Sequence, residues 1–511
     1  MNTSLNTIGR KFSDALAGAL VRADEAAVAQ NNGQKVHVSG AGRTLTFAYE
    51  QLRNAAEYTE EHLLLQRAIR RFYKRIFLSR DAGYMKVSAE ELIIELTLAG
   101  YVKNDTIAVS TIDTINALAV DYFAAHKKHT KEAWTLDILA VEVELLLNDE
   151  VRQSVFAQFA YDHFLETIDQ AKVFGKSVED FEVALFVAVQ RALLKSDLAT
   201  IRAALLRRYQ QTPTSNTYGQ TNKMLDRIFA SSTTDTLFRL VNRKGAPFRI
   251  LWRLIDEHDN SATLLQSREQ FLSAYETQIA NEYTRINERI NRGIIKSVIF
   301  LVITKVLIGV AVEVPYDYLV HGAILWLPLA INLLFPPIYM ILLRFTLSLP
   351  GQANTRSLID SIDELLYNDQ KTVTLSRQAG GGFGTAFNII YALFFVAIFG
   401  GVGWWLTSLG FAIPHLLIFF VFLSTASFLG FRLSRQIREL EVVESQQDGI
   451  SIVRDFLYIP FVVVGRWMSE KYARVNVVAM TLDMVIELPL KTVLHLVRQW
   501  GAFITSKKDE L

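Results

Sequence analysis

The stretch "IIKSVIFLVITKVLIGVAVEV", from Ile294 to Val314, decides the class of this protein. A helix of about 20 mainly apolar residues is long enough to cross the roughly 30 Å hydrocarbon layer of a bilayer. Further apolar stretches of this kind occupy residues 319–345, 386–409 and 411–431. The sequence therefore predicts four transmembrane helices between residues 294 and 431, with a loop at 346–385 in the middle.

The composition narrows the function classes. Hydrophobic residues make up 50% of the 511 residues, and the net charge is +1. A chain so close to neutral has no global preference for nucleic acid, so such a preference would require a local patch. The absence of cysteine excludes disulfides, thiolate metal sites and thiol nucleophiles. The first thirty residues have no long apolar core and contain acidic residues, so we expect no export signal.

Basic residues flank the predicted spans on one side, which sets the expected orientation. They are Arg285, Arg289, Arg292, Lys296, Arg344, Arg356, Arg432, Arg435 and Arg438. The short opposite turns, "EVPYDY" and the turn around Gly410, contain no Lys or Arg. We therefore expect both termini and the central loop in the cytoplasm. The terminal "KDEL" at 508–511 is then coincidental, because a lumenal receptor could not reach it.

The rest of the chain predicts an all-α protein with a large cytoplasmic part. Residues 1–258 are typical of a mainly helical domain, with a possible β-hairpin at 35–47, where "KVHVSGAGRTLTF" alternates around two glycines. Residues 261–292 predict one long juxtamembrane helix with a single apolar stripe. Packing of that stripe on the domain is favoured over a coiled-coil seam.

The C-terminal region, 432–511, predicts amphipathic helices on the cytoplasmic side. A polar residue recurs every fourth position along one otherwise apolar segment, at Asp483, Glu487, Lys491 and His495. A helix lying in the membrane interface accounts best for one polar stripe. The alternative is that residues 475–500 cross the membrane as a further span.

A basic helix face occurs at residues 67–75 in the N-terminal half. Arg67, Arg70, Arg71, Lys74 and Arg75 follow the spacing of a single helical face. Such a face could bind anionic lipid headgroups or nucleic-acid phosphates. It could also be a solvated face that pairs with acidic helices such as 90–95, and this structural interpretation is favoured.

Polar residues inside the predicted spans are the other candidate site. Lys305 lies deep in the first span, and an ionisable group there is a functional candidate by default. Asn332 in the second span and His415 in the fourth are its candidate partners. Lys305 also lies about two helical turns before Glu313, so its side chain could instead extend toward the outer surface.

Motifs of enzymes and cofactor sites are missing from the sequence. The glycines at 380–384 have no following Lys-Ser/Thr, unlike a phosphate-binding loop. His126 and His129 have no further ligand at a recognised metal-site spacing. We find no catalytic constellation, and we therefore expect no enzymatic activity, cofactor or metal.

Two segments carry a family resemblance. They are "LLLQRAIRRFYKRIF…AEELIIELTLAGYVKNDTI" in the N-terminal half and "PFVVVGRWMSEKYARVNVVAMTLDMVIELPLKTVLHLVRQWGAFITSKKDEL" at the C-terminus. With the apolar spans between them, the chain resembles a family of multi-pass membrane proteins from small-genome candidate-phylum bacteria. The resemblance implies a bacterial inner membrane and carries no assigned activity.

These patterns favour a non-enzymatic function. The large helical region and the long juxtamembrane helix suggest a membrane-anchored scaffold or interaction protein, with membrane lipids and an unidentified protein as partners. A transporter or channel component that uses Lys305 and a proline-kinked second span is the alternative. A nucleic-acid tether through the basic face 67–75 is a weaker one.

Overall fold

The computed structural model describes eleven stretches of the chain. They are residues 4–31, 34–40, 43–44, 46–47, 50, 63–79, 82–129, 133–148, 151–368, 385–442 and 449–474. These residues are mainly helical, and none of them belongs to a strand, which confirms the all-α prediction at this level.

The chain forms two compact units. Within the described ranges, the first unit comprises residues 4–6, 171–175 and 242–474, and the second comprises residues 7–170 and 176–241. The division falls after Val241 rather than at residue 258. Helix α14 (Ala246–Glu257) therefore belongs to the same unit as the predicted spans.

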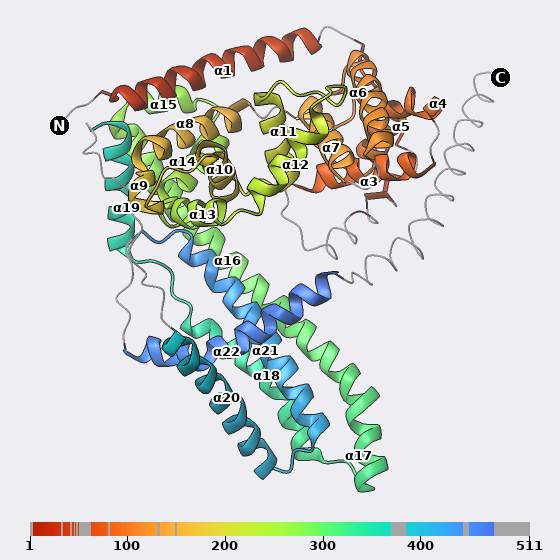
Figure 1. Cartoon of the computed structure of the whole chain (residues 1–511), viewed down its shortest axis with the longest axis vertical. Helices are drawn as coiled ribbons and strands as arrows, with labels where there is room; N and C mark the ends of the chain where they lie inside the picture. The colour runs from red at the N-terminus through yellow and green to blue at the C-terminus, as the bar shows by residue number, and fades with distance from the viewer. Residues whose placement is uncertain are drawn as a thin grey trace. The chain divides into compact units, whose positions relative to one another are not determined.

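The second unit is a helical domain. Its helices are α1 (Thr7–Asn31), α3 (Leu64–Ser79), α4 (Ala82–Met85), α5 (Ser88–Leu98), α6 (Val109–Lys128), α7 (Trp134–Leu147), α8 (Val151–Thr167), α10 (Phe181–Val189), η2 (Gln190–Leu194), α11 (Leu198–Arg208), α12 (Tyr218–Phe229) and α13 (Ser232–Lys244). Helix α7 packs on α3, α6 and α11, and α1 packs on α8 (Figure 1). Nine of the fourteen α7 residues are buried, so this helix is central to the core.

A buried arginine ties α7, α11 and α12 together. The guanidinium of Arg202 in α11 donates to both the carbonyl and the side-chain oxygen of Asn222, and it also pairs with Asp226. The indole N–H of Trp134 in α7 donates to the other Asp226 oxygen at 3.1 Å. Because every charged group here has a partner, Arg202 can remain buried at low cost.

The predicted β-hairpin at 35–47 is wrong for the described residues. Lys35 forms an isolated antiparallel bridge with Ala108 instead of pairing within the segment. The side chain of Asn104 then holds both the N–H and the carbonyl of Val38, at 2.8 and 3.1 Å. The segment is extended, but its backbone bonds to residues 104–108 rather than to a second strand of its own hairpin.

The first unit contains the apolar helices. Its elements are α9 (Gln170–Phe174), α14, α15 (Ser261–Gln266), α16 (Arg268–Ile308), η3 (Gly309–Glu313), α17 (Val314–His321), α18 (Trp326–Thr346), α19 (Gln352–Leu366), α20 (Thr385–Ser408), α21 (Ile413–Arg438) and α22 (Gly449–Arg474). Helices α16, α18 and α21 pack against one another along the bundle (Figure 1). α19 packs on α14 and α16, and α22 packs on α21.

Four helices in the described residues are long and apolar enough to cross a membrane. They are Arg268–His321, Trp326–Thr346, Ile389–Ser408 and Ile413–Arg438. This confirms four candidate spans but moves the first turn. The segment "EVPYDY" is helical, because η3 continues directly into α17 at Val314, and Pro315 lies in the first turn of α17. The chain instead turns after Gly322, whose φ of +71° is a conformation that glycine adopts readily.

The predicted loop and C-terminal region also contain packed helices. α19 buries Leu358, Ile362 and Leu365 rather than lying free in solvent. α22 places Phe461 in an apolar cluster with Leu406 of α20 and other residues of the span helices. Part of the region 432–511 therefore packs on the bundle of candidate spans.

Candidate functional site

A charged pair is buried within the first candidate span. Lys305 and Glu313 are 1% and 0% exposed, and the Lys305 Nζ lies 2.5 Å from the Glu313 Oε1. The Lys305 ammonium also lies 5.0 Å from the ring centre of Phe422 in α21, which is a cation–π distance. Lys305 thus points into the bundle and does not extend to the surface.

A π turn brings these two residues onto one face. Residues eight apart in a regular α-helix lie about 80° apart around the axis. Between them, η3 replaces the α-helical pattern, and the N–H of Val314 bonds to the carbonyl of Gly309, five residues back. The wider turn takes up one extra residue, so Glu313 rotates back toward the face of Lys305. Such turns are frequent at functional sites.

Asn332 links this pair to α21. Its side-chain amide donates to Glu313 Oε1 at 3.1 Å and to the carbonyl of His415 at 3.2 Å. Asn332 lies in α18 and is fully buried, as is His415 in the first turn of α21. One amide group therefore joins three helical segments in the interior of the bundle.

A second carboxylate completes the arrangement. Asp317 in α17 is fully buried, and its Oδ1 lies 3.2 Å from the Nε2 of His415. Its other oxygen accepts the backbone N–H of Leu325 at 2.9 Å, immediately before α18 begins. The ring of His321, which is 35% exposed, lies 3.9 Å from Asp317 Oδ1. We name the residues Lys305, Glu313, Asp317, Asn332 and His415 the buried polar cluster.

Several atoms of the buried polar cluster have no hydrogen-bond partner among the described residues. They are Glu313 Oε2, Asp317 Oδ1, Asn332 Oδ1, and both ring nitrogens of His415. His415 Nε2 and Asp317 Oδ1 are close, but they are not aligned as a hydrogen bond. Buried polar atoms in folded proteins are nearly always paired, so this concentration makes the cluster a candidate functional site.

Sequence reasoning found part of this cluster. Lys305, Asn332 and His415 were expected as intramembrane polar residues, and the structure brings all three together. Glu313 and Asp317 were missed because they were placed at the membrane surface and in a turn. The signal was their spacing of four residues, which puts two carboxylates on one helical face once the segment is read as helix.

The basic face of α3 is largely engaged within its own unit. Arg70 pairs with Asp137 at 2.5 Å, Arg71 with Glu50 at 2.7 Å, and Arg75 with Glu95 at 2.7 Å. The side chains of Arg67 and Lys74 are exposed. At least three of the five basic groups thus meet acidic partners, one of them in the helix expected to do so, and this supports the structural interpretation of the face.

The predicted polar stripe cannot be placed. Asp483, Glu487, Lys491 and His495 lie outside the described residues.

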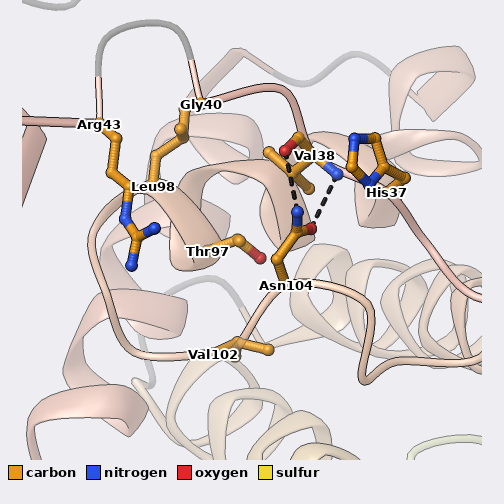
Figure 2. A pocket seen from close by; sticks show the side chains of 8 residues that line it. All are labelled: His37, Val38, Gly40, Arg43, Thr97, Leu98, Val102 and Asn104. Atoms are coloured by element: carbon orange, nitrogen blue, oxygen red, sulfur yellow. Dashed lines mark hydrogen bonds between the residues drawn. The ribbon is translucent and has the colours of Figure 1, made fainter.

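A small surface pocket lies in the second unit. Its volume is about 220 Å³, and it is lined by His37, Val38, Gly40, Arg43, Thr97, Leu98, Val102 and Asn104 (Figure 2). Asn104 uses both polar atoms of its amide to hold the Val38 backbone, and His37 lies 3.0 Å from Asp105. The polar groups other than Arg43 and Thr97 are thus occupied by structural contacts, so the pocket offers little chemistry.

Neither a metal site nor a similarity to known proteins points to a function. Among the described residues, no group of three or more His, Asp or Glu side chains could hold a metal ion. Comparisons with protein families, curated proteins and solved structures find no match to this chain. The resemblance to a bacterial membrane-protein family stays a prediction, and the buried polar cluster is the feature from which function can be argued.

Proposed function

We propose that this chain is an ion-coupled transporter or channel component of a bacterial inner membrane. The observation that carries the proposal is the buried polar cluster, in which Lys305, Glu313, Asp317, Asn332 and His415 are at most 1% exposed. Ionisable residues inside spans are costly, and they mark ion pathways and proton relays in pumps and transporters. Helices α16, α18 and α21 would then form the conducting core.

A purely structural role accounts for the cluster less well. A buried ion pair offsets its desolvation cost only when further hydrogen bonds satisfy the remaining polar atoms. Here Glu313 Oε2, Asn332 Oδ1 and both His415 nitrogens remain unpaired among the described residues. A network that served packing alone would be expected to pair them, since a partly satisfied network is worse than an apolar core.

The basic residues support one orientation for this bundle. Arg344 at the end of α18 and Arg435 and Arg438 at the end of α21 lie at the ends away from the two short turns. Following the positive-inside rule, we infer that both termini and α19 are cytoplasmic and that the turns after His321 and Ser408 are periplasmic. Asp317 and His415 then lie near the periplasmic side.

The scaffold function remains a second candidate, favoured by the anchoring of α16. The guanidinium of Arg268 makes two hydrogen bonds to Asp363 of α19, at 2.7 and 2.9 Å. Tyr275 of α16 donates to the carbonyl of Pro247 at 2.9 Å. One helix thus joins the polar helices of the first unit to its apolar bundle, as expected for an anchor. The basic face of α3, with at least three of its five groups paired internally, adds no support for a nucleic-acid tether.

A flux measurement separates transport from scaffolding. Purified full-length protein would be placed in vesicles of phosphatidylethanolamine and phosphatidylglycerol, and entry of protons and of radioactive sodium would be followed under an imposed potential. We expect faster entry of at least one ion than in protein-free vesicles. Rates equal to those of protein-free vesicles for both ions would exclude ion-coupled flux and leave the scaffold.

Two lysine variants in α16 make this test specific. Lys305→Met removes the buried ammonium, whereas Lys296→Met removes an exposed one on the same helix. We expect flux to be lost in the first and retained in the second. Because Lys305→Met leaves the buried Glu313 carboxylate without its cation, the double variant Lys305→Met/Glu313→Met replaces the ion pair by two apolar side chains and controls for folding. Full flux in the double variant would contradict the role of the cluster.

A further inference from the structure

We propose that the coupling species bound by the buried polar cluster is a proton, held by His415 and Asp317. The inference rests on the proposed function for its role in transport. The geometry that carries it is independent of flux. A fully buried imidazole nitrogen and a fully buried carboxylate oxygen lie 3.2 Å apart, and neither atom has a hydrogen-bond partner among the described residues.

The cluster is poorly suited to a metal cation. Such ions take several oxygen ligands at once, six to eight for calcium. One carboxylate oxygen of Glu313 already lies 2.5 Å from the Lys305 ammonium, and that positive charge would repel a cation. The described residues also contain no acidic or histidine group with metal-site geometry. A proton needs only one lone pair and imposes none of these requirements.

Charge balance favours a bound proton. With Lys305 protonated and both carboxyls ionised, the cluster carries one net negative charge while His415 is neutral. A proton on His415 brings the buried charges to two positive and two negative. Uncompensated buried charge is strongly unfavourable, so the protonated cluster is the balanced state and release of the proton leaves one uncompensated charge. Binding and release of the proton therefore change the net charge that is buried between α16, α18 and α21.

The groups that face His415 are consistent with this site. From α17, the carboxylate of Asp317 lies against the ring, the Tyr316 ring centre is 6.1 Å away, and His321 is reached through Asp317. From α18, Asn332 contacts only the backbone carbonyl of His415 and does not titrate. Glu313, with Lys305 behind it, is bound to the same amide.

His321 provides an entry from water. Its side chain is 35% exposed, and it lies 3.9 Å from the Asp317 oxygen that is near His415. The order His321, Asp317, His415 therefore leads from the turn after α17 to the interior. An imidazole can accept a proton on one ring nitrogen and donate one from the other, so a proton can pass through this side chain.

Further polar groups follow on the same helices beyond the cluster. Ser424 of α21 is fully buried and its hydroxyl has no partner among the described residues. Ser427 donates to the Tyr339 hydroxyl of α18 at 3.1 Å. Arg344, near the end of α18, then bonds to Asn291 and Asn287 of α16 at 2.6 and 2.7 Å. Polar groups thus continue on α18 and α21 between the cluster and the other ends of these helices.

Nuclear magnetic resonance of ring-labelled histidine tests the proton site directly. Full-length protein in lipid nanodiscs would be followed from about pH 8 to about pH 5, with the His415 signal assigned by its loss in His415→Gln. We expect His415 to pass from the neutral ring to imidazolium reversibly. A ring that stays in one protonation state across this range in the folded protein would overturn the inference.

A variant of Asp317 and a change of salt test whether Asp317 shares the proton and whether sodium binds instead. At about pH 6, the ratio of imidazolium to neutral ring at His415 should fall at least about tenfold in Asp317→Asn, because the opposite charge is removed. An unchanged ratio would contradict the shared site. If the His415 signal changed when sodium replaced choline but did not change with pH, the site would be assigned to sodium instead. Titration without flux in vesicles would reject transport while the proton site stands, so the two failures are distinguishable.

Discussion

The pKa of His163 in α8 is lowered by burial. Desolvation lowers the pKa of its imidazole to about 4, well below the ordinary value of 6.5. The folded protein therefore keeps this ring neutral, while the unfolded chain binds a proton as soon as the pH falls below the ordinary value. Stability contributed by the neutral ring is present above that value and is lost as the pH falls toward 4.

We therefore expect the thermal unfolding midpoint of the purified chain to fall between about pH 6.5 and pH 4. His163→Gln should flatten this fall, because glutamine does not take up a proton. Scanning calorimetry at a series of pH values measures both. His37→Gln is the control, since the His37 side chain is 75% exposed and its removal should leave the fall in place. An equal fall in the His163 variant would contradict the assignment.

The cluster residues show what a sequence can and cannot supply at this scale. Lys305, Asn332 and His415 were found because each interrupts an apolar stretch. Glu313 and Asp317 were not, because a proline and several polar residues around them are typical of a turn. Whether such a segment is turn or helix depends on packing against α18 and α21, which local preferences do not contain.

At the scale of elements, close contact between helices depends on glycine. A methyl group added at Gly465 of α22 would lie 2.1 Å from the backbone oxygen of Ser424 in α21. Backbone cannot move aside as a flexible side chain can. Small residues of this kind allow span helices to approach closely.

Gly465→Ala is therefore expected to separate α21 from α22 and to destabilise the bundle by about 1–3 kcal/mol. Gly400→Ala in α20 is the matched control, because nothing lies within 4 Å of the added methyl group. Thermal unfolding in detergent should show a lower midpoint for the first variant and little change for the second. Equal midpoints would argue against close packing of α21 and α22.

The sequence predicted the apolar helices, but it did not predict the first span boundary or the structure of residues 35–47. The four apolar helices follow directly from runs of about 20 apolar residues, which only a helix can carry through a membrane. The boundary between the first two spans was wrong because α16, η3 and α17 continue to His321. The hairpin at 35–47 failed because a bridge to Ala108 replaced local pairing.

For the whole molecule, the central prediction is the orientation in the membrane. The chain contains no cysteine, so a single cysteine can be placed without altering the rest. Gln352 at the start of α19 and Ser408 at the end of α20 are both exposed. Under the inferred orientation, Gln352 faces the cytoplasm and Ser408 the opposite side.

A membrane-impermeant maleimide applied to intact cells without their outer membrane should label Ser408→Cys and not Gln352→Cys. Inverted vesicles should give the reverse. Both variants can be labelled after detergent is added, which controls for reactivity. The opposite pattern would invert the bundle and place the Asp317–His415 pair on the cytoplasmic side.

The uninterrupted helix from Arg268 to His321 has a mechanical consequence. Its 26 residues before Ile294 extend about 39 Å beyond the apolar part, at about 1.5 Å per residue. Counting from the middle of a bilayer about 30 Å thick, the lever arm is about 54 Å. A tilt of about 10°, well within the range seen for such helices, would displace its far end by about 9 Å. A small rotation at the level of Lys305, in the middle of the span, therefore becomes a large displacement at Arg268.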